Sequence, residues 1–267
     1  MITAIKNLNV KLDLIKQLLK RDILIRYKGS LLGFLWAIIQ PIIMLSVYTF
    51  VFSVIFQAKW GISESTSKSE YALLLFVGLI FFNIFSDVIN RSPGLIVANS
   101  SYVTKVVFPT EILSIVALGN ALVHSLISFV VLIVAKYIIT GDFYWTSLYL
   151  IPFIYLSVGL LTLGISWILS SLGVFLRDLN YLIGIIVQVL FFMTPIFYPV
   201  TSVPEEFQFV MQLNPLTGVI ENARNIILFG EMPNWEWYFS SLFMSLIIAI
   251  FGYIWFNKTK KAFADVL

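Results

Sequence analysis

The chain has 267 residues, of which 60% are hydrophobic and only 12% are charged, and its mean hydropathy is +0.95. A soluble domain of this length carries about a quarter charged residues and under half apolar ones, so the composition excludes a water-soluble fold and predicts an integral membrane protein. The absence of cysteine and the single histidine exclude disulfides, iron–sulfur clusters and thiolate zinc sites, and a net charge of +3 is too small to indicate a nucleic-acid partner.

Residues 1–30 predict a cytoplasmic amphipathic helix. Between residues 8 and 28, an apolar stripe recurs every three or four residues, formed by Leu8, Leu12, Ile15, Leu19 and Ile23. Leu14 and Leu18 fall off this stripe. The helix is expected to lie along the inner leaflet with its lysines toward anionic headgroups. It serves either as a basic topology anchor alone or also as a contact for a partner or a lipid head. No cleavable signal peptide is predicted, because the basic start lacks a continuous apolar region.

Six apolar runs have the length of about 20 residues that a helix needs to cross a bilayer. They are 31–56, 71–90, 112–139, 148–175, 180–199 and 239–256. An even number of spans places both termini on one side. Lysine and arginine are concentrated in the N-terminal tail, the 91–111 loop, the 176–179 turn and the 257–267 tail, so both termini are predicted to be cytoplasmic. The expected fold is an all-α, six-span membrane domain over residues 31–256.

Two connecting segments are expected to contain short helices. In the 91–111 loop, Pro93–Gly94 and Pro109 bracket a helix around 95–106, which is either a handle for a soluble partner or a plain connector. The 200–238 segment is too long for an ordinary loop, and its apolar pieces 207–213 and 216–229 are too short to span. Two interfacial or re-entrant helices that guard an external exit explain this pattern, provided that their backbone is buried in protein or lines a cavity.

The sequence offers little chemistry of its own. It contains no P-loop motif, so active transport requires a motor on another polypeptide. The spans have few carboxylates, which argues against an ion-coupled carrier without excluding one. His124 in the third span is predicted to be a hydrogen-bonded interior residue rather than a proton relay. A membrane-embedded transferase needs a polar catalytic cluster, and neither paired carboxylates nor a histidine motif is present.

Aromatic residues are frequent in the first and fifth spans. Aromatic faces stack on the apolar C–H faces of sugar rings without requiring one hydroxyl pattern, so an aromatic wall suits a sliding carbohydrate chain. Packing against lipid or against one another is the alternative. The candidate lining residues are Phe34, Trp36, Tyr48, Phe52, Phe191, Phe192, Phe197 and Tyr198.

Five blocks in chain order resemble one family over essentially the whole length. They are RYKGSLLGFLWAIIQPI (26–42), SSYVTKVVFPTEIL (100–113), SSLGVFLRDLNYL (170–182), FFMTPIFYP (191–199) and LNPLTGVIENAR (213–224). Together they resemble the permease subunit of ABC-2 type polysaccharide exporters, which move O-antigen, capsule or teichoic-acid chains. Among these, the chain is most similar to the O-antigen (Wzm-like) group.

The resemblance implies a bacterial inner-membrane protein that works as a homodimer with two copies of a P-loop ATPase. ATP and Mg²⁺ would bind to that partner, and this chain would hold no cofactor, no metal and no catalytic residue. The implied substrate is an undecaprenyl-pyrophosphate-linked polysaccharide, with O-antigen as the first expectation. Teichoic acid, capsule, or a small lipid or drug are the alternatives.

The resemblance also implies roles for individual residues. Arg26 and Lys28, at the cytoplasmic mouth of the first span, are candidates for attracting the lipid pyrophosphate, with snorkelling anchors as the rival interpretation. Arg177 and Asp178 are expected to form an ion pair that ties the turn between the fourth and fifth spans. The surface expected to contact the ATPase contains Lys16, Lys20, Arg21, Ser101, Tyr102 and Lys105.

Overall fold

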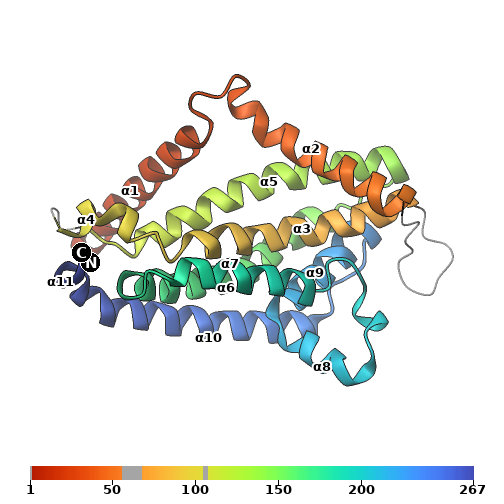
Figure 1. Ribbon diagram of the computed structural model, residues 1–267. Helices are drawn as coiled ribbons and strands as arrows, with labels where there is room; N and C mark the ends of the chain where they lie inside the picture. The colour runs from red at the N-terminus through yellow and green to blue at the C-terminus, as the bar shows by residue number, and fades with distance from the viewer. Residues whose placement is uncertain (1, 56–67, 105–107) are drawn as a thin grey trace.

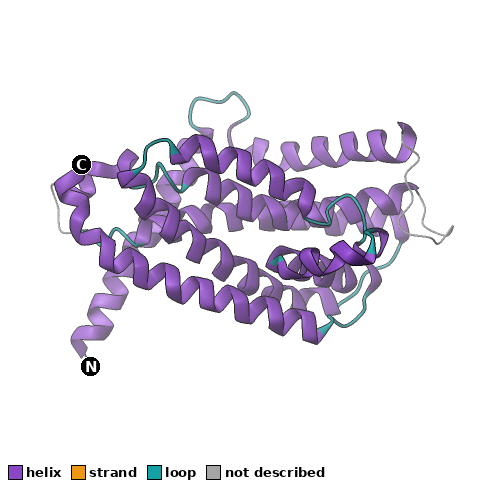
Figure 2. Cartoon of the chain, turned by 60° about the horizontal axis from the view of Figure 1, so that its bottom comes forward, coloured by secondary structure: helices purple, strands orange, loops and turns teal. Residues whose placement is uncertain are grey.

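The computed structural model describes residues 2–55, 68–104 and 108–267, and every regular element in these ranges is a helix (Figures 1 and 2), as predicted. The main helices are α1 (Ile2–Tyr27), α2 (Trp36–Tyr48), α3 (Lys68–Arg91), α4 (Ser100–Thr104), α5 (Ile112–Thr140), α6 (Thr146–Phe175), α7 (Leu179–Met193), α8 (Glu205–Leu213), α9 (Pro215–Arg224), α10 (Trp235–Thr259) and α11 (Phe263–Val266). Short 3₁₀ helices are η1 (Gly33–Leu35), η3 (Val97–Asn99), η4 (Val200–Ser202) and η6 (Lys260–Ala262), while η2 (Thr49–Ile55) and η5 (Asn225–Phe229) are π-helical continuations of α2 and α9.

Five helical segments of the described residues are long and apolar enough to cross a bilayer, and α7 is a shorter apolar sixth. The five are Gly33–Phe52, Ser69–Arg91, Ile112–Thr140, Ser147–Phe175 and Trp235–Val266. The fifth predicted span was expected to reach residue 199, but α7 ends at Met193. Thr194 is extended, with ψ 138°, because the residue before a proline is disfavoured in helical geometry and Pro195 follows it.

α3 is the central helix of the bundle, and it packs against α5, α6, α7 and α9. Residues 71–82 of α3 are all buried. Around it, α6 and α10 form the most extensive helix pair. A Cβ added at Gly252 of α10 would lie 2.2 Å from the backbone oxygen of Gly164 on α6. Small residues at such a crossing let helix backbones approach closely in a membrane.

The packed face of α1 overlaps the predicted apolar stripe only in part. Leu18 is buried against Ile112 and Val116 at the start of α5, with Leu14 packed beside it. Leu12 of the predicted stripe is 46% exposed. Ile15 and Leu19 of the predicted stripe pack beside Leu14 and Leu18, so the face of α1 that meets α5 includes part of the stripe and both leucines that fall off it.

The two short helices predicted between residues 200 and 238 are present as α8 and α9. α9 is buried between α3, α6 and α10, which satisfies the requirement that backbone at membrane depth is enclosed by protein. α8 instead exposes apolar side chains such as Phe209, which is 66% exposed. Figure 1 shows both chain ends at one end of the bundle, so they lie on the same side of a membrane. The assignment of that side to the cytoplasm stays a prediction.

Candidate functional site

α3 carries a polar stripe on its one exposed face. Between residues 71 and 90, every side chain is buried except Asn83, Ser86, Asp87 and Asn90. Positions separated by three, four and seven residues share one face of a helix. The hydrocarbon core does not solvate amides or carboxylates, so this face requires water, protein or a polar ligand. The stripe therefore marks a hydrophilic surface in the half of the bundle that contains the two chain ends.

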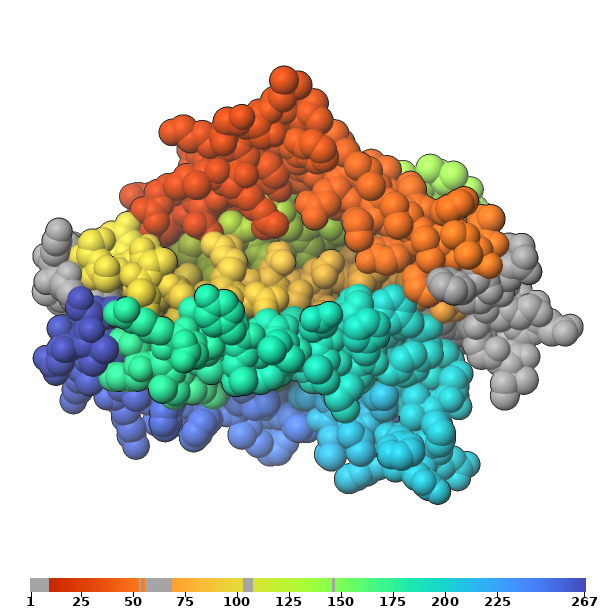
Figure 3. Space-filling model, in the orientation of Figure 1, coloured from red at the N-terminus to blue at the C-terminus, as the bar shows by residue number. Residues whose placement is uncertain are grey.

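α3 is flanked by α2 and α7, two helices with few buried side chains. In the space-filling view of Figure 3, α3 is visible between α1 and α2 on one side and α7 on the other. Ala37 is the one buried side chain described in α2, and Ile183 and Val187 are the two in α7. We call this surface of α2, α3 and α7 the furrow. A single chain leaves it open along one side.

A cavity of about 330 Å³ lies behind α2, bounded by α3, α5 and Phe191 of α7. Its polar lining comes from α1 (Arg26), α2 (Gln40), α3 (Asn83 and Asp87) and α5 (His124, Ser125 and Ser128). Its walls also contain aromatic rings, among them Tyr48. The cavity therefore combines neutral hydrogen-bonding groups with apolar ring surfaces.

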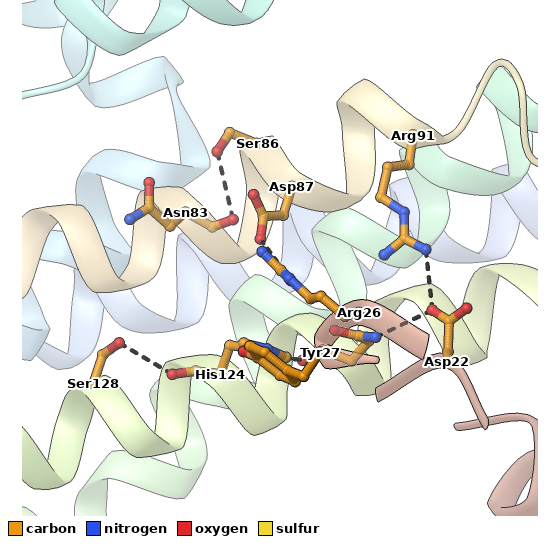
Figure 4. Close-up of polar contacts among 10 residues, drawn as sticks. Asp22, Arg26, Tyr27, Asn83, Ser86, Asp87, Arg91, His124 and Ser128 are labelled. Atoms are coloured by element: carbon orange, nitrogen blue, oxygen red, sulfur yellow. Dashed lines mark hydrogen bonds and ion pairs between the residues drawn. The ribbon is translucent and has the colours of Figure 1, made fainter. Parts of the chain in front are cut away.

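The C-terminal half of α1 is attached to α3 and α5 by a polar cluster (Figure 4). The Asp22 carboxylate accepts hydrogen bonds from Arg91 Nη2 at 3.0 Å and from Asn120 Nδ2 at 3.1 Å. Arg26 Nη1 lies 3.9 Å from Asp87 Oδ2. Asp22 and Arg26 are one turn apart, so the same face of α1 contacts two charged residues of α3.

Tyr27 and His124 join the end of α1 to the third span. The Tyr27 hydroxyl lies 2.5 Å from His124 Nε2, and the two rings stack with centroids 5.7 Å apart. His124 Nδ1 lies 2.8 Å from the backbone oxygen of Asn120, which only accepts, so Nδ1 carries the proton. In the neutral ring, Nε2 is then the acceptor and Tyr27 the donor. His124 is thus a hydrogen-bonded interior residue in this structure, as expected.

Arg26 and Lys28 do not converge on one site. Arg26 lines the cavity on the α3 side. Lys28 lines a different groove, of about 730 Å³, together with Lys20, Arg21 and Phe34. The two cations predicted to attract one pyrophosphate therefore face separate spaces in this conformation.

The structure gathers most of the predicted aromatic lining at the end of the furrow that lies away from the chain termini. Phe52 stacks on Phe197 with ring centroids 5.6 Å apart, and Phe191 lies 5.1 Å from Phe197 and 5.4 Å from Phe192. Tyr48 lies 6.4 Å from Phe52. The first and fifth spans thus contribute to one aromatic cluster. Burial raises the pKa of Tyr198, whose hydroxyl donates to the backbone oxygen of Phe192.

Two of the predicted aromatic residues lie away from this cluster. Phe34, in η1 between α1 and α2, packs edge-on against Tyr27 at a centroid distance of 5.6 Å. Trp36, at the start of α2, is 40% exposed. Neither has a ring contact with the other predicted lining residues, because both precede η2, whose Phe52 meets Phe197.

The predicted partner-contact surface is assembled in part. Arg21 Nη1 donates to the Tyr102 hydroxyl at 2.7 Å, which joins α1 to α4. Lys16, Lys20 and Ser101 are exposed. Lys105 lies outside the described residues. The predicted 95–106 helix is represented by η3 and α4, so its helical part begins at Val97.

The turn between α6 and α7 does not contain the predicted ion pair between Arg177 and Asp178. Arg177 and Asp178 are both exposed there, and the ion pairs of the described residues include none between them. Backbone bonds hold the turn instead: the Asp178 oxygen accepts from Tyr181 N at 3.1 Å. Within the same described ranges, no group of three or more His, Asp or Glu side chains is placed to hold a metal ion.

Arg224 is a buried residue that was not predicted as a site residue, because it lies in the 200–238 segment that was expected to be external. Its guanidinium is 1% exposed and donates to the backbone oxygens of Leu74, Pro195 and Ile196 at 2.8–3.1 Å. It also donates to Glu221 Oε1 at 2.8 Å. The available signal was the Glu221–Arg224 spacing of three within an apolar helix, which places both charges on one face.

Comparison with known proteins identifies the family of this helical bundle. Residues 13–228 match the model of the ABC-2 type transporter family. The chain belongs to the ABC-2 type transporter family. A relative named O-antigen export system permease protein RfbA, from Klebsiella pneumoniae, is 30% identical over 98% of this chain and 97% of its own length. A protein of the same name from Myxococcus xanthus is 24% identical over 99% of each chain. The polysialic acid transport protein KpsM of Escherichia coli is 27% identical over 81% of each.

The family match covers the furrow, the cavity and the polar cluster of this ABC-2 transporter chain. The matched range begins within α1 and ends within η5, so it contains every element that contributes to these features. It stops before α10, which packs on the far side of α6 from α3. The site described above thus lies in the part of the chain that carries the family signature.

Proposed function

We propose that this chain is the membrane-spanning permease subunit of an ATP-driven exporter that moves undecaprenyl-pyrophosphate-linked polysaccharide of the O-antigen class across the bacterial inner membrane. The names of the relatives, which refer to O-antigen and polysialic acid, support the substrate class. The observation that carries the proposal is the polar stripe of α3, which faces a furrow whose external end is aromatic. A glycan chain offers hydroxyls to such a stripe and apolar C–H faces to such rings.

A second copy of the chain closes the furrow in this proposal. α2 and α7 expose large apolar side chains such as Ile43, Ile185 and Phe192. In a homodimer, two furrows facing each other form one enclosed conduit, and the apolar edges of α2 and α7 pack across the interface. Residues 1–30 and 257–267 then lie on the cytoplasmic side, with α8 and α9 at the external exit.

The motor is a separate P-loop ATPase, which binds ATP and Mg²⁺ and contacts α1 and α4. α1 is held to α3 by Asp22 and Arg26 and to α5 by Tyr27, and it leads through residues 28–35 into α2. Closure of the ATPase dimer therefore pushes on a helix that is mechanically connected to the walls of the furrow. The resulting tilt of α2 and α7 opens the conduit. This chain performs no covalent step.

Deletion and complementation test the proposed function. Removal of the reading frame is expected to abolish the surface polysaccharide, while lipid-linked chains accumulate inside the cell, and the intact gene restores export. Affinity purification of the chain is expected to recover an ATPase in equal amounts. Unchanged surface polysaccharide in the deletion strain contradicts the proposal. Because the KpsM relatives are named for polysialic acid transport, the glycan that is lost is identified by its sugar composition.

A charge exchange tests the proposed role of Arg26 in attracting the lipid pyrophosphate. Arg26→Glu is expected to impair export while the protein remains inserted and dimeric. The double variant Arg26→Glu with Asp87→Arg rebuilds the ion pair with reversed polarity. If Arg26 attracts phosphate, the double variant stays impaired. Full recovery of export indicates that pairing with Asp87 is its whole role.

A further inference from the structure

The cavity behind α2 contains hydrogen-bonding groups that no described residue satisfies. The side-chain amides of Gln40 and Asn83 both line it, and neither has a hydrogen-bond partner among the described residues. Each amide offers two N–H donors and one acceptor oxygen. By contrast, Ser125 pairs with Tyr155, and Ser128 donates to the backbone oxygen of His124.

Both amides lie well inside apolar spans, away from the span ends. Gln40 is seven residues from the start of the first span and Asn83 is eight residues from the end of the second. At a rise of 1.5 Å per residue, each lies about 10–12 Å along its helix from the end of the span. The hydrocarbon region offers no hydrogen-bond partner for an amide. The two side chains therefore require a polar occupant.

The charges of the residues that line the cavity indicate which kind of polar ligand it can hold. Arg26 and Asp87 both line it, with Nη1 and Oδ2 3.9 Å apart, so their charges balance and the lining has no net charge. The remaining polar lining is neutral. Tyr48, Phe76 and Phe191 supply apolar ring surfaces to the same cavity. Amides beside aromatic rings match a neutral sugar ring, which carries hydroxyls around its edge and C–H groups on its faces.

We propose that this cavity is a sugar-binding subsite within each subunit, in which the amides of Gln40 and Asn83 hydrogen-bond the hydroxyls of a neutral sugar ring of the passing glycan. This inference rests on the proposed function and adds a specificity-determining site to it. Since the cavity lies between α2, α3 and α5 of one chain, it does not need the second copy to be complete. Its position beside the furrow lets one sugar at a time enter from the conduit.

Photocrosslinking in living cells tests occupancy of the subsite. Met44 lines the cavity, and its replacement by p-benzoylphenylalanine places a reactive ketone there. Illumination is expected to attach glycan to the chain, detected as a high-mass adduct that is labelled after periodate oxidation. The matched control is the same replacement at Phe243, which is 64% exposed on α10, away from the cavity. This control is expected to give lipid adducts without periodate-sensitive sugar.

Two variants test the amides themselves. Asn83→Leu and Gln40→Leu keep the side-chain size but remove the hydrogen bonds, and each is expected to lower the rate of surface polysaccharide export about two- to tenfold. Asn257→Leu makes the same change on α10, where the amide bonds only within its own helix, and is expected to leave export unchanged.

The outcomes separate this inference from the proposed function. If deletion of the gene leaves surface polysaccharide intact, the proposed function fails. If deletion abolishes export, but the Met44 probe captures only lipid and both leucine variants export normally, the subsite alone is refuted. If a leucine variant does not fold, the crosslink in the otherwise native chain decides.

Discussion

Tyr27, the last residue of α1, stacks on His124 of the third span and hydrogen-bonds to its Nε2 across 2.5 Å. This contact, together with those of Asp22 and Arg26, attaches α1 to the spans that line the cavity. A helix that receives force from an ATPase transmits it only through such attachments. The polar cluster is therefore the point at which mechanical coupling is testable.

Tyr27→Phe keeps the ring stack and removes the hydroxyl. The loss of one hydrogen bond is expected to destabilise the docking of α1 by about 1 kcal/mol and to lower export severalfold. ATP hydrolysis by the partner is expected to continue, since the nucleotide site is elsewhere. Surface polysaccharide and ATPase activity, measured on the same membranes, give the ratio of transport to hydrolysis.

Tyr137→Phe is the control for this variant. Tyr137 lies on the same helix as His124, is 60% exposed, and its hydroxyl forms no hydrogen bond with any described residue. It is expected to leave the coupling ratio unchanged. Equal coupling in the Tyr27→Phe variant and the wild type contradicts a transmitting role for this contact.

Arg224 fixes α9 to the ends of α3 and α7 through a planar guanidinium. Arg224→Met leaves the Glu221 carboxylate and three backbone oxygens without their donor. Removing one partner of a buried ion pair costs about 3–5 kcal/mol, so a large fall in thermal stability in detergent is expected. Adding Glu221→Gln removes the uncompensated charge and is expected to recover part of the loss. Arg177→Met, on the exposed turn, serves as the control and is expected to change little.

The span positions and the two short helices were predictable because bilayer thickness and proline positions act locally. Runs of about 20 apolar residues mark crossings wherever they occur. Pro204 and Pro215 set the starts of α8 and α9, because proline is favoured at a helix start. Pro195 also indicates the early end of α7, since proline disfavours helical geometry in the residue before it.

The features that required the structure depend on which helices meet. The spacing of Asn83, Ser86, Asp87 and Asn90 was visible in the sequence as a polar stripe, but its importance emerges only from the burial of every other face of α3. Leu18 packs against α5, and no pattern within α1 points to that neighbour. Arg224 appeared as a loop charge because its partners lie 28 or more residues away, apart from Glu221.

The ion pairs of Glu111 are expected to make the stability of the fold sensitive to acid. Its carboxylate lies 3.1 Å from Lys11 Nζ and 3.6 Å from Lys260 Nζ, which joins α1, the start of α5 and the C-terminal segment. Burial acts to raise the pKa of Glu111, but the hydrogen bonds from its own backbone and from Lys11, with the charge of Lys260, outweigh burial and hold this pKa below its usual value. A lowered pKa stabilises the fold above the unfolded pKa of about 4.3, and this stability is lost as the pH falls through the folded value.

Glu111→Gln removes this contribution, which is about 0.5–1 kcal/mol because both lysines are partly exposed. The difference in thermal midpoint between wild type and Glu111→Gln is expected to be constant above about pH 5.5 and to shrink below about pH 4.3. Glu206→Gln, an exposed carboxylate on α8, is expected to show no such pH-dependent difference. A difference that stays constant to pH 3.5 rules out the proposed ionic contribution.

The absence of cysteine makes the polar stripe directly accessible to labelling. Asn83→Cys and Asn90→Cys place single thiols on the exposed face of α3, and Ile247→Cys places one on α10, where the side chain is 50% exposed. Thiols react with maleimides as thiolates, which form in water and not in hydrocarbon. If the furrow is hydrated, a charged maleimide added to inside-out membrane vesicles modifies the two α3 thiols at least tenfold faster than the α10 thiol. Equal, slow modification at all three positions means that α3 faces lipid or packed protein, and that the polar stripe does not line a water-filled path.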